Sequence, residues 1–184
     1  ISQKTGKLNN LSGGKIMDDY VREAYRTMEH GQTDKKLDAY DSGRIYYYLG
    51  DYQKAYLALE EAKGKGGVDS YLYLGKAYAA TGDYNYASSV YSNYLSKQGP
   101  DAEIYNQLGL CELAKKDYQK ALEAFQAGKQ IEGNSLMQTL SFNEIVAYEY
   151  LQDYQKAAVL LKAYLQNYPD DQAAIREQQF LSTR

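Results

Sequence analysis

Apolar side chains recur along most of the chain at steps of three and four residues, which is the period of an amphipathic α-helix. The first such face consists of Met17, Val21, Ala24 and Met28. It predicts a helix over residues 16–30 that follows a polar, glycine-containing lead-in over residues 1–15. Only two prolines occur in 184 residues, so long helices are permitted almost everywhere.

The helical pattern is itself repeated. An aspartate recurs before a tyrosine at Asp51, Asp83, Asp117 and Asp153, with separations of 32, 34 and 36 residues. A small residue follows each pair at a fixed offset, at Ala55, Ala87, Ala121 and Ala157, and a bulky residue comes four positions later, at Leu59, Tyr91, Phe125 and Leu161. This period predicts stacked helix pairs, with small residues where helix axes approach closely and the aspartates at helix N-termini.

This pattern resembles that of the tetratricopeptide repeat (TPR) family, which reads Trp-x2-Leu-Gly-x2-Tyr, then Ala-x3-Phe, then Pro. The second repeat matches it with aromatic exchanges only, at Tyr71, Leu74, Gly75, Tyr78, Ala87 and Tyr91. In the third repeat Glu112 stands where the family has an aromatic residue, and the fourth carries Ile145 in place of the glycine. The resemblance covers roughly residues 36–169.

The resemblance implies an all-α fold, a right-handed α-solenoid of about four TPR-type helix pairs with capping helices at both ends. The array is expected to form one domain over residues 16–184. Its repeats are expected at about 36–67, 68–100, 101–133 and 134–169. The helix over 16–30 would cap the N-terminal end and a helix over 170–181 the C-terminal end, because a solenoid otherwise exposes an apolar face at each terminus.

Composition and charge exclude several kinds of function. A net charge of −3 argues against a nucleic-acid partner, which requires a basic surface, and no apolar run is long enough for a transmembrane segment. His30 and Cys111 are the only histidine and cysteine, which disfavours a zinc site and a Cys–His catalytic pair. The glycine-rich segment 64–67 lacks the ending of a phosphate-binding loop. We therefore expect no enzyme activity, no metal and no cofactor.

In TPR proteins the first helix of each repeat lines a concave groove that holds a peptide or a partner helix. Transferred to this register, the groove positions are Tyr40, Arg44, Tyr47, Tyr48, Asp69, Leu72, Lys76, Ala79, Glu103, Asn106, Leu110, Leu113, Phe142, Val146, Glu149 and Tyr150. The chain has 22 tyrosines and no tryptophan, and most of the tyrosines fall on structural positions of the repeat. The four tyrosines in this set are the exceptions.

The family's carboxylate clamp of Lys, Asn and Arg is incomplete, because only Arg44 and Lys76 are cationic among its positions. The other matching positions hold Tyr40, Tyr73 and Ala80. The resemblance therefore does not imply a chaperone co-factor of the clamp type. Arg44 and Lys76 should be neighbours that either hold an acidic or C-terminal group of a peptide, or are solvated and pair with Asp69 and Asp41.

The leading interpretation is a non-enzymatic scaffold that binds another protein or a peptide in the concave groove. One alternative is a self-associating structural module, so a homo-oligomer stays open. Another is a glycan- or solute-binding accessory of a bacterial surface system, because an aromatic groove also suits a sugar. The chain begins at Ile1 without an initiator methionine. This beginning is compatible with an envelope protein whose leader is removed, and equally with a trimmed cytoplasmic chain.

Overall fold

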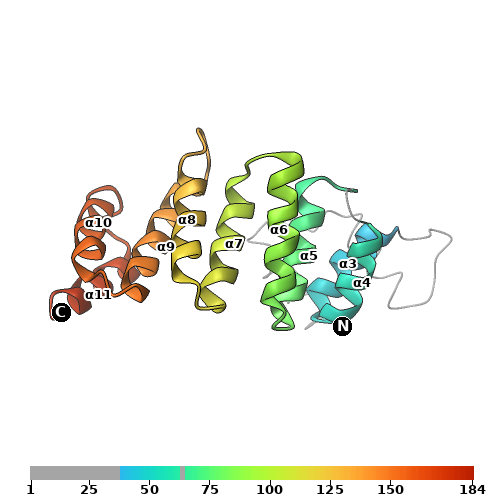
Figure 1. Cartoon of the computed structure of the whole chain (residues 1–184), viewed down its shortest axis with the longest axis horizontal. Coiled ribbons are helices and arrows are strands. Elements are labelled where there is room, and N and C mark those ends of the chain that lie inside the picture. Colours follow the sequence, from blue (N-terminus) through green and yellow to red (C-terminus); the bar gives the residue numbers. More distant parts are fainter. Residues whose placement is uncertain (1–37, 63–64) are drawn as a thin grey trace. The chain divides into compact units, whose positions relative to one another are not determined.

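The computed structural model describes residues 38–62 and 65–184, and within these ranges every regular element is an α-helix (Figure 1). The predicted lead-in over 1–15 and the predicted helix over 16–30 lie outside the described residues. The chain divides into two compact units, Ile1–Val90 and Tyr91–Arg184, so that the boundary falls inside α6 (Tyr84–Gln98).

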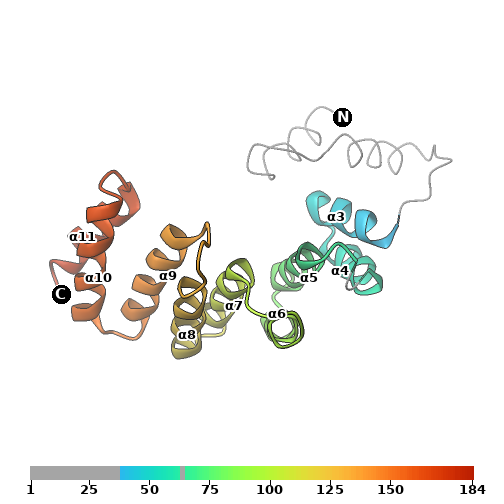
Figure 2. The ribbon, with the colours of Figure 1, turned by 90° about the horizontal axis from the view of Figure 1, so that it is seen from above.

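The first unit contains α3 (Ala39–Leu49), α4 (Tyr52–Glu61), α5 (Val68–Ala80) and the first half of α6. Helix α3 packs on α4, α4 packs on α5, and α3 also contacts α5, as the view from above shows (Figure 2). The fully buried apolar side chains of this unit include Ile45, Ala55, Leu59, Leu74 and Ala77. Ala55, Leu59 and Leu74 are residues of the repeat pattern identified in the sequence.

The second unit contains the rest of α6, α7 (Ala102–Ala114), α8 (Tyr118–Lys129), α9 (Met137–Tyr150), α10 (Tyr154–Asn167) and α11 (Gln172–Leu181). From α7 onward each helix packs on the next (Figure 2). Helix α11 corresponds to the helix predicted over 170–181 and buries Ala174 and Leu181 in the same core cluster as Leu161 of α10. The chain is an all-α solenoid of helical repeats, as the sequence predicts.

The recurring aspartates begin the second helix of each pair, which confirms their predicted role. The side chain of each accepts a hydrogen bond from a backbone N–H three residues later, at Asp51, Asp83, Asp117 and Asp153. The residue before the aspartate adopts a left-handed conformation, with φ of 79° at Gly50 and 87° at Gly82. Lys116 and Gln152 hold the same conformation in the last two repeats, with φ of 65° and 62°, although their side chains disfavour it.

Small residues allow the two helices of a repeat to cross closely. A Cβ atom placed on Gly43 would overlap the side chain of Leu59, and one placed on Gly109 would overlap the ring of Phe125. Both neighbours are fully buried. The glycines of the first and third repeats therefore make room for the bulky residue of the following helix, which is the contact that the repeat pattern predicts.

Candidate protein-interaction surface

Five predicted or neighbouring side chains gather where α3 and α5 lie side by side. We call them the tyrosine–arginine cluster, consisting of Tyr40, Arg44, Tyr47, Tyr48 and Tyr73. The rings of Tyr47, Tyr48 and Tyr73 lie 5.4–5.9 Å apart between centroids with interplanar angles of 71–75°. This edge-to-face arrangement is favourable for aromatic pairs, so the three rings stabilise one another.

Arg44 is embedded in this cluster. Its guanidinium lies 5.1 Å from the ring centroid of Tyr40 and 5.6 Å from that of Tyr73, within the range of a cation–π contact. Nη1 of Arg44 lies 3.8 Å from Oδ1 of Asp41, and the Arg44 side chain is only 18% exposed. The expected pairing with Asp41 is therefore present, but the expectation that this arginine is solvated is wrong, because the aromatic rings cover it.

Two hydroxyl groups of the cluster are close enough to bond, and burial acts on three of them. The Tyr48 and Tyr73 hydroxyls lie 2.6 Å apart, within hydrogen-bond distance. Burial raises the pKa of Tyr40, Tyr47 and Tyr48 above the ordinary value for tyrosine. All three therefore keep their protons at neutral pH and can donate hydrogen bonds to an acceptor on a ligand.

The cluster is fixed from both sides by the rest of the unit. The ring of Tyr47 makes an edge contact with Tyr52, at 5.6 Å between centroids. The ring of Tyr40 lies against Gly66 in the turn before α5, so closely that a Cβ atom there would be 2.8 Å from Cζ. Lys65 in the same turn pairs with Asp38 at 3.3 Å. The cluster is therefore held in place before any ligand arrives.

The other predicted positions of the first unit differ in exposure. Asp69 is exposed, Lys76 and Ala79 are half-buried, and Leu72 is buried. Tyr73 was matched to a position of the family's carboxylate clamp but was not included among the groove positions, although it lies four residues after Asp69 and three before Lys76. That spacing places it on the same helical face and is the signal that could have included it.

In the second unit most of the predicted positions make contacts within the chain. Asn106 is buried and accepts a hydrogen bond from Asn143 at 2.9 Å, and Glu103 accepts one from Gln107 at 3.0 Å. The ring of Phe142 lies 5.7 Å from that of Tyr164, and Leu113 and Val146 are half-buried. Leu110 is 40% exposed and Tyr150 is 54% exposed, the latter stacked on Tyr118 at 4.9 Å.

Glu149 lies in an unusual electrostatic environment. Burial and the neighbouring carboxylate of Glu177 on α11 raise its pKa from an ordinary 4.5 to about 7. At neutral pH a substantial fraction of Glu149 therefore carries a proton.

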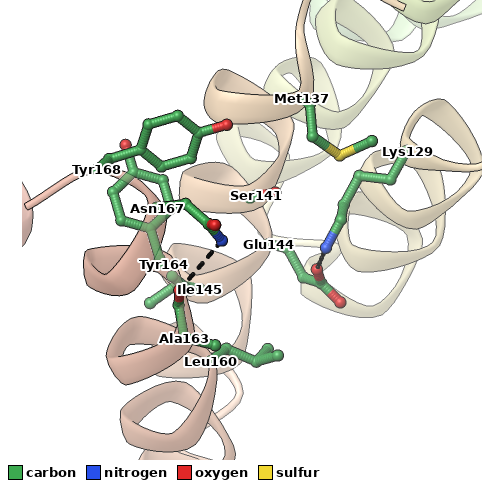
Figure 3. Close-up of a pocket in the computed structure, with 10 residues that line it drawn as sticks. All are labelled: Lys129, Met137, Ser141, Glu144, Ile145, Leu160, Ala163, Tyr164, Asn167 and Tyr168. Atoms are coloured by element: carbon green, nitrogen blue, oxygen red, sulfur yellow. Dashed lines mark hydrogen bonds and ion pairs between the residues drawn. The ribbon is translucent and has the colours of Figure 1, made fainter. Parts of the chain in front are cut away.

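A pocket of about 230 Å³ lies between the end of α8, α9 and α10 (Figure 3). Figure 3 shows the Lys129 and Glu144 side chains pointing toward one another below Met137, and their charged atoms are 2.6 Å apart. Gln126 donates to the other oxygen of Glu144 at 3.0 Å, so both carboxylate oxygens are bonded within the chain. None of the lining residues is among the predicted groove positions.

Within residues 38–62 and 65–184, no three His, Cys, Asp or Glu side chains are grouped so as to bind a metal. No helix in these ranges is long and apolar enough to cross a membrane.

The fold and this surface define a helical-repeat module of the kind that binds other proteins. Residues 72–135 and residues 142–171 each match a family model described as tetratricopeptide repeat, and together they cover about half of the chain. The chain belongs to the TPR family. No curated protein matches it in sequence.

Several solved structures share the fold. The crystal structure of MamA protein superposes with a TM-score of 0.68 at 21% identity, covering 78% of each chain. A double mutant of MamA from RS-1 also reaches 0.68, at 18% identity, covering 92% of this chain and 86% of that one. The second TPR domain of human RPAP3, in complex with the HSP70 peptide SGPTIEEVD, reaches 0.54 at 16% identity, covering 60% of this chain and 90% of that domain. At such identities the likeness is one of fold.

Proposed function

We propose that this chain is a non-enzymatic protein-interaction module that binds an extended peptide or a partner helix on the face formed by α3 and α5. The observation that carries this proposal is the tyrosine–arginine cluster. Tyrosine offers a large contact area with few rotatable bonds, and here the rings are already ordered by one another.

The chemistry of the cluster suits a peptide with an acidic or C-terminal carboxylate. The 3.8 Å between Arg44 and Asp41 exceeds the usual 2.7–3.2 Å of a hydrogen bond, so Asp41 leaves the guanidinium with donor capacity for a ligand. Guanidinium and carboxylate form strong charge-assisted hydrogen bonds, and these gain from the low exposure of Arg44. The HSP70 peptide in the RPAP3 structure ends in Glu-Glu-Val-Asp, which shows that a domain of similar fold accommodates such an end.

The test is binding to a peptide library displayed with free C-termini, for the wild type and an Arg44→Ala, Lys76→Ala double variant. We expect peptides selected on the wild type to bind the double variant at least about tenfold more weakly, since a charge-assisted hydrogen bond contributes roughly 1.5–3 kcal/mol. A Lys162→Ala, Arg176→Ala double variant removes the same charge from exposed positions on α10 and α11 and should bind like the wild type. Equal binding by all three proteins would refute the proposal.

Self-association is separated by a second measurement. Size-exclusion chromatography with light scattering should show a monomer across a range of concentrations if the face binds foreign peptides. A dimer that the Arg44→Ala, Lys76→Ala variant dissociates would mean instead that the face binds another copy of the chain.

A further inference from the structure

One position of the repeat connects the first helix to the helix before it in the second and fourth repeats. This position lies nine residues before the aligned alanine and holds Tyr46, Tyr78, Glu112 and Tyr148 in the four repeats. Tyr78 shows its ordinary role. Its ring stacks on Tyr56 at 4.4 Å and lies 4.3 Å from Tyr86, and its hydroxyl donates to Glu60 at 3.2 Å.

The fourth repeat uses the same arrangement. The hydroxyl of Tyr148 accepts a hydrogen bond from Gln126 at 3.3 Å. Gln126 in α8 corresponds to Glu60 in α4, because each lies five residues after the aligned alanine of its helix. A tyrosine on one helix and a long polar side chain on the preceding helix thus fill the space between them.

Both members of this pair are shorter in the third repeat. Glu112 replaces the tyrosine, and Ser92, five residues after Ala87, replaces the long polar side chain. A pocket of about 370 Å³ lies at this place and is lined by both residues. Tyr105, Leu108, Ala124 and Ala127 form its apolar wall. The pocket therefore occupies a space that a tyrosine side chain helps to fill in the neighbouring repeats.

The charge of this pocket is incompletely balanced. Glu112 is only 5% exposed, its Oε1 accepts from Lys115 at 3.0 Å, and no group in the described part of the chain donates to its Oε2. Lys120 also lines the pocket but pairs with Asp117 at 3.1 Å, whereas Glu123 adds a second carboxylate. A buried carboxylate oxygen without a donor is costly, so the pocket favours a ligand that brings a positive charge and hydrogen-bond donors.

The contrast with the pocket of Figure 3 strengthens this point. There Glu144 is equally buried, but Lys129 and Gln126 satisfy both of its oxygens. Glu144 is accounted for as an internal structural group. Glu112, in contrast, lines the larger of the two pockets and has one carboxylate oxygen without a donor in the described part of the chain.

We infer that the pocket between α6, α7 and α8 binds an arginine side chain presented by a partner protein. The flat guanidinium matches the space of an aromatic ring, can bond a carboxylate with two parallel N–H groups, and stacks well on a tyrosine such as Tyr105. The aliphatic stem would lie along Leu108 and the alanines. A small rotation of the Glu112 side chain is needed to bring Oε2 to the ligand.

This pocket shares no residue with the tyrosine–arginine cluster. Tyr105, Leu108 and Glu112 lie at helical spacing on one side of α7, whereas the predicted groove positions Glu103, Asn106 and Leu110 follow another side. The two sites can therefore be tested independently, and failure at one leaves the other intact.

The experiment titrates the isotopically labelled full chain with the blocked tripeptide Gly-Arg-Gly and records amide shifts by NMR. We expect saturable shifts at Tyr105, Leu108, Glu112 and Ala124. The matching citrulline tripeptide, which has nearly the same shape and no charge, should bind about tenfold more weakly because a charge-assisted hydrogen bond is lost.

Variants of Glu112 decide whether the binding occurs in this pocket. Glu112→Gln keeps the size of the side chain and should also weaken binding of Gly-Arg-Gly about tenfold. Glu112→Tyr restores the aromatic ring and should abolish it. Glu132→Gln removes the same charge from an exposed loop and should change nothing. Absence of saturable shifts, equal binding of the citrulline peptide, or full binding by Glu112→Gln would overturn the inference.

Discussion

The contact between Gly109 and Phe125 allows a prediction in which two opposing effects compete. Replacing glycine by alanine in a helix interior normally stabilises a protein by about 1 kcal/mol. Here the new Cβ would overlap Cε1 of Phe125 and approach Cδ1 and Cζ to 2.7 Å. The ring is fully buried and has no solvent-facing space to move into. Overpacking of this kind costs about 1–3 kcal/mol, so we expect Gly109→Ala to lower the free energy of unfolding by about 1 kcal/mol.

A second substitution isolates the cause. Phe125→Leu removes the ring atoms that the new methyl group meets and by itself should destabilise through the cavity it leaves. In the double variant the methyl group occupies part of that cavity, so the two effects should not add, and we expect a favourable coupling of about 0.5–2 kcal/mol. Urea unfolding followed by circular dichroism measures all four proteins. A Gly109→Ala variant as stable as the wild type, or strictly additive effects, would refute the assigned contact.

Three further predictions concern single side chains. Lys116→Gly should stabilise the chain by about 0.5–1 kcal/mol in urea unfolding, because glycine adopts the left-handed turn without the strain of a side chain; a loss of stability would contradict the strain. Glu149 has a folded-state pKa of about 7 against an ordinary 4.5, so it binds a proton more tightly when folded and its contribution to stability falls as the pH rises between these values. Glu149→Gln should therefore raise the melting temperature near pH 8 more than near pH 5, and an equal change at both would argue against the effect of burial and Glu177. Cys111 should resist thiol reagents until the chain unfolds, because burial and the adjacent carboxylate raise its pKa to about 11; rapid labelling of the native chain would count against its burial.

The fold could be predicted because its determinants are local and repeated. The aspartate before each second helix, the alanine four residues after it and the glycines such as Gly109 each have one physical role, and the structure places them in that role. Four spaced copies make the period unmistakable. The repeat boundaries stay predictions. The N-terminal helix also stays a prediction, since residues 1–37 lie outside the described part of the chain.

The candidate site could be predicted only in part. The repeat register determines on which side of a helix a residue lies, but not which other side chains pack over that residue. Register brought Arg44 and the neighbouring tyrosines together, yet gave no sign that Tyr73 would enclose the guanidinium. It also marked Asn106 as a groove position, although a hydrogen bond to Asn143 holds it inside the second unit. The pocket at Glu112 depends on two residues, one of them in another repeat, and the departure from the family pattern alone did not reveal a cavity.

The shortened pair at Glu112 and Ser92 also has a consequence for how the array unfolds. In a linear repeat protein, cooperativity depends on the coupling between neighbouring repeats, and the tyrosine contacts of Tyr78 and Tyr148 contribute to it. At Glu112 that contribution is reduced, so a break between cooperative blocks is expected there. A partner's side chain bound in the pocket would supply the missing contact between the two blocks. The larger the fraction of chains with a bound side chain, the more the two blocks should unfold together in a single transition.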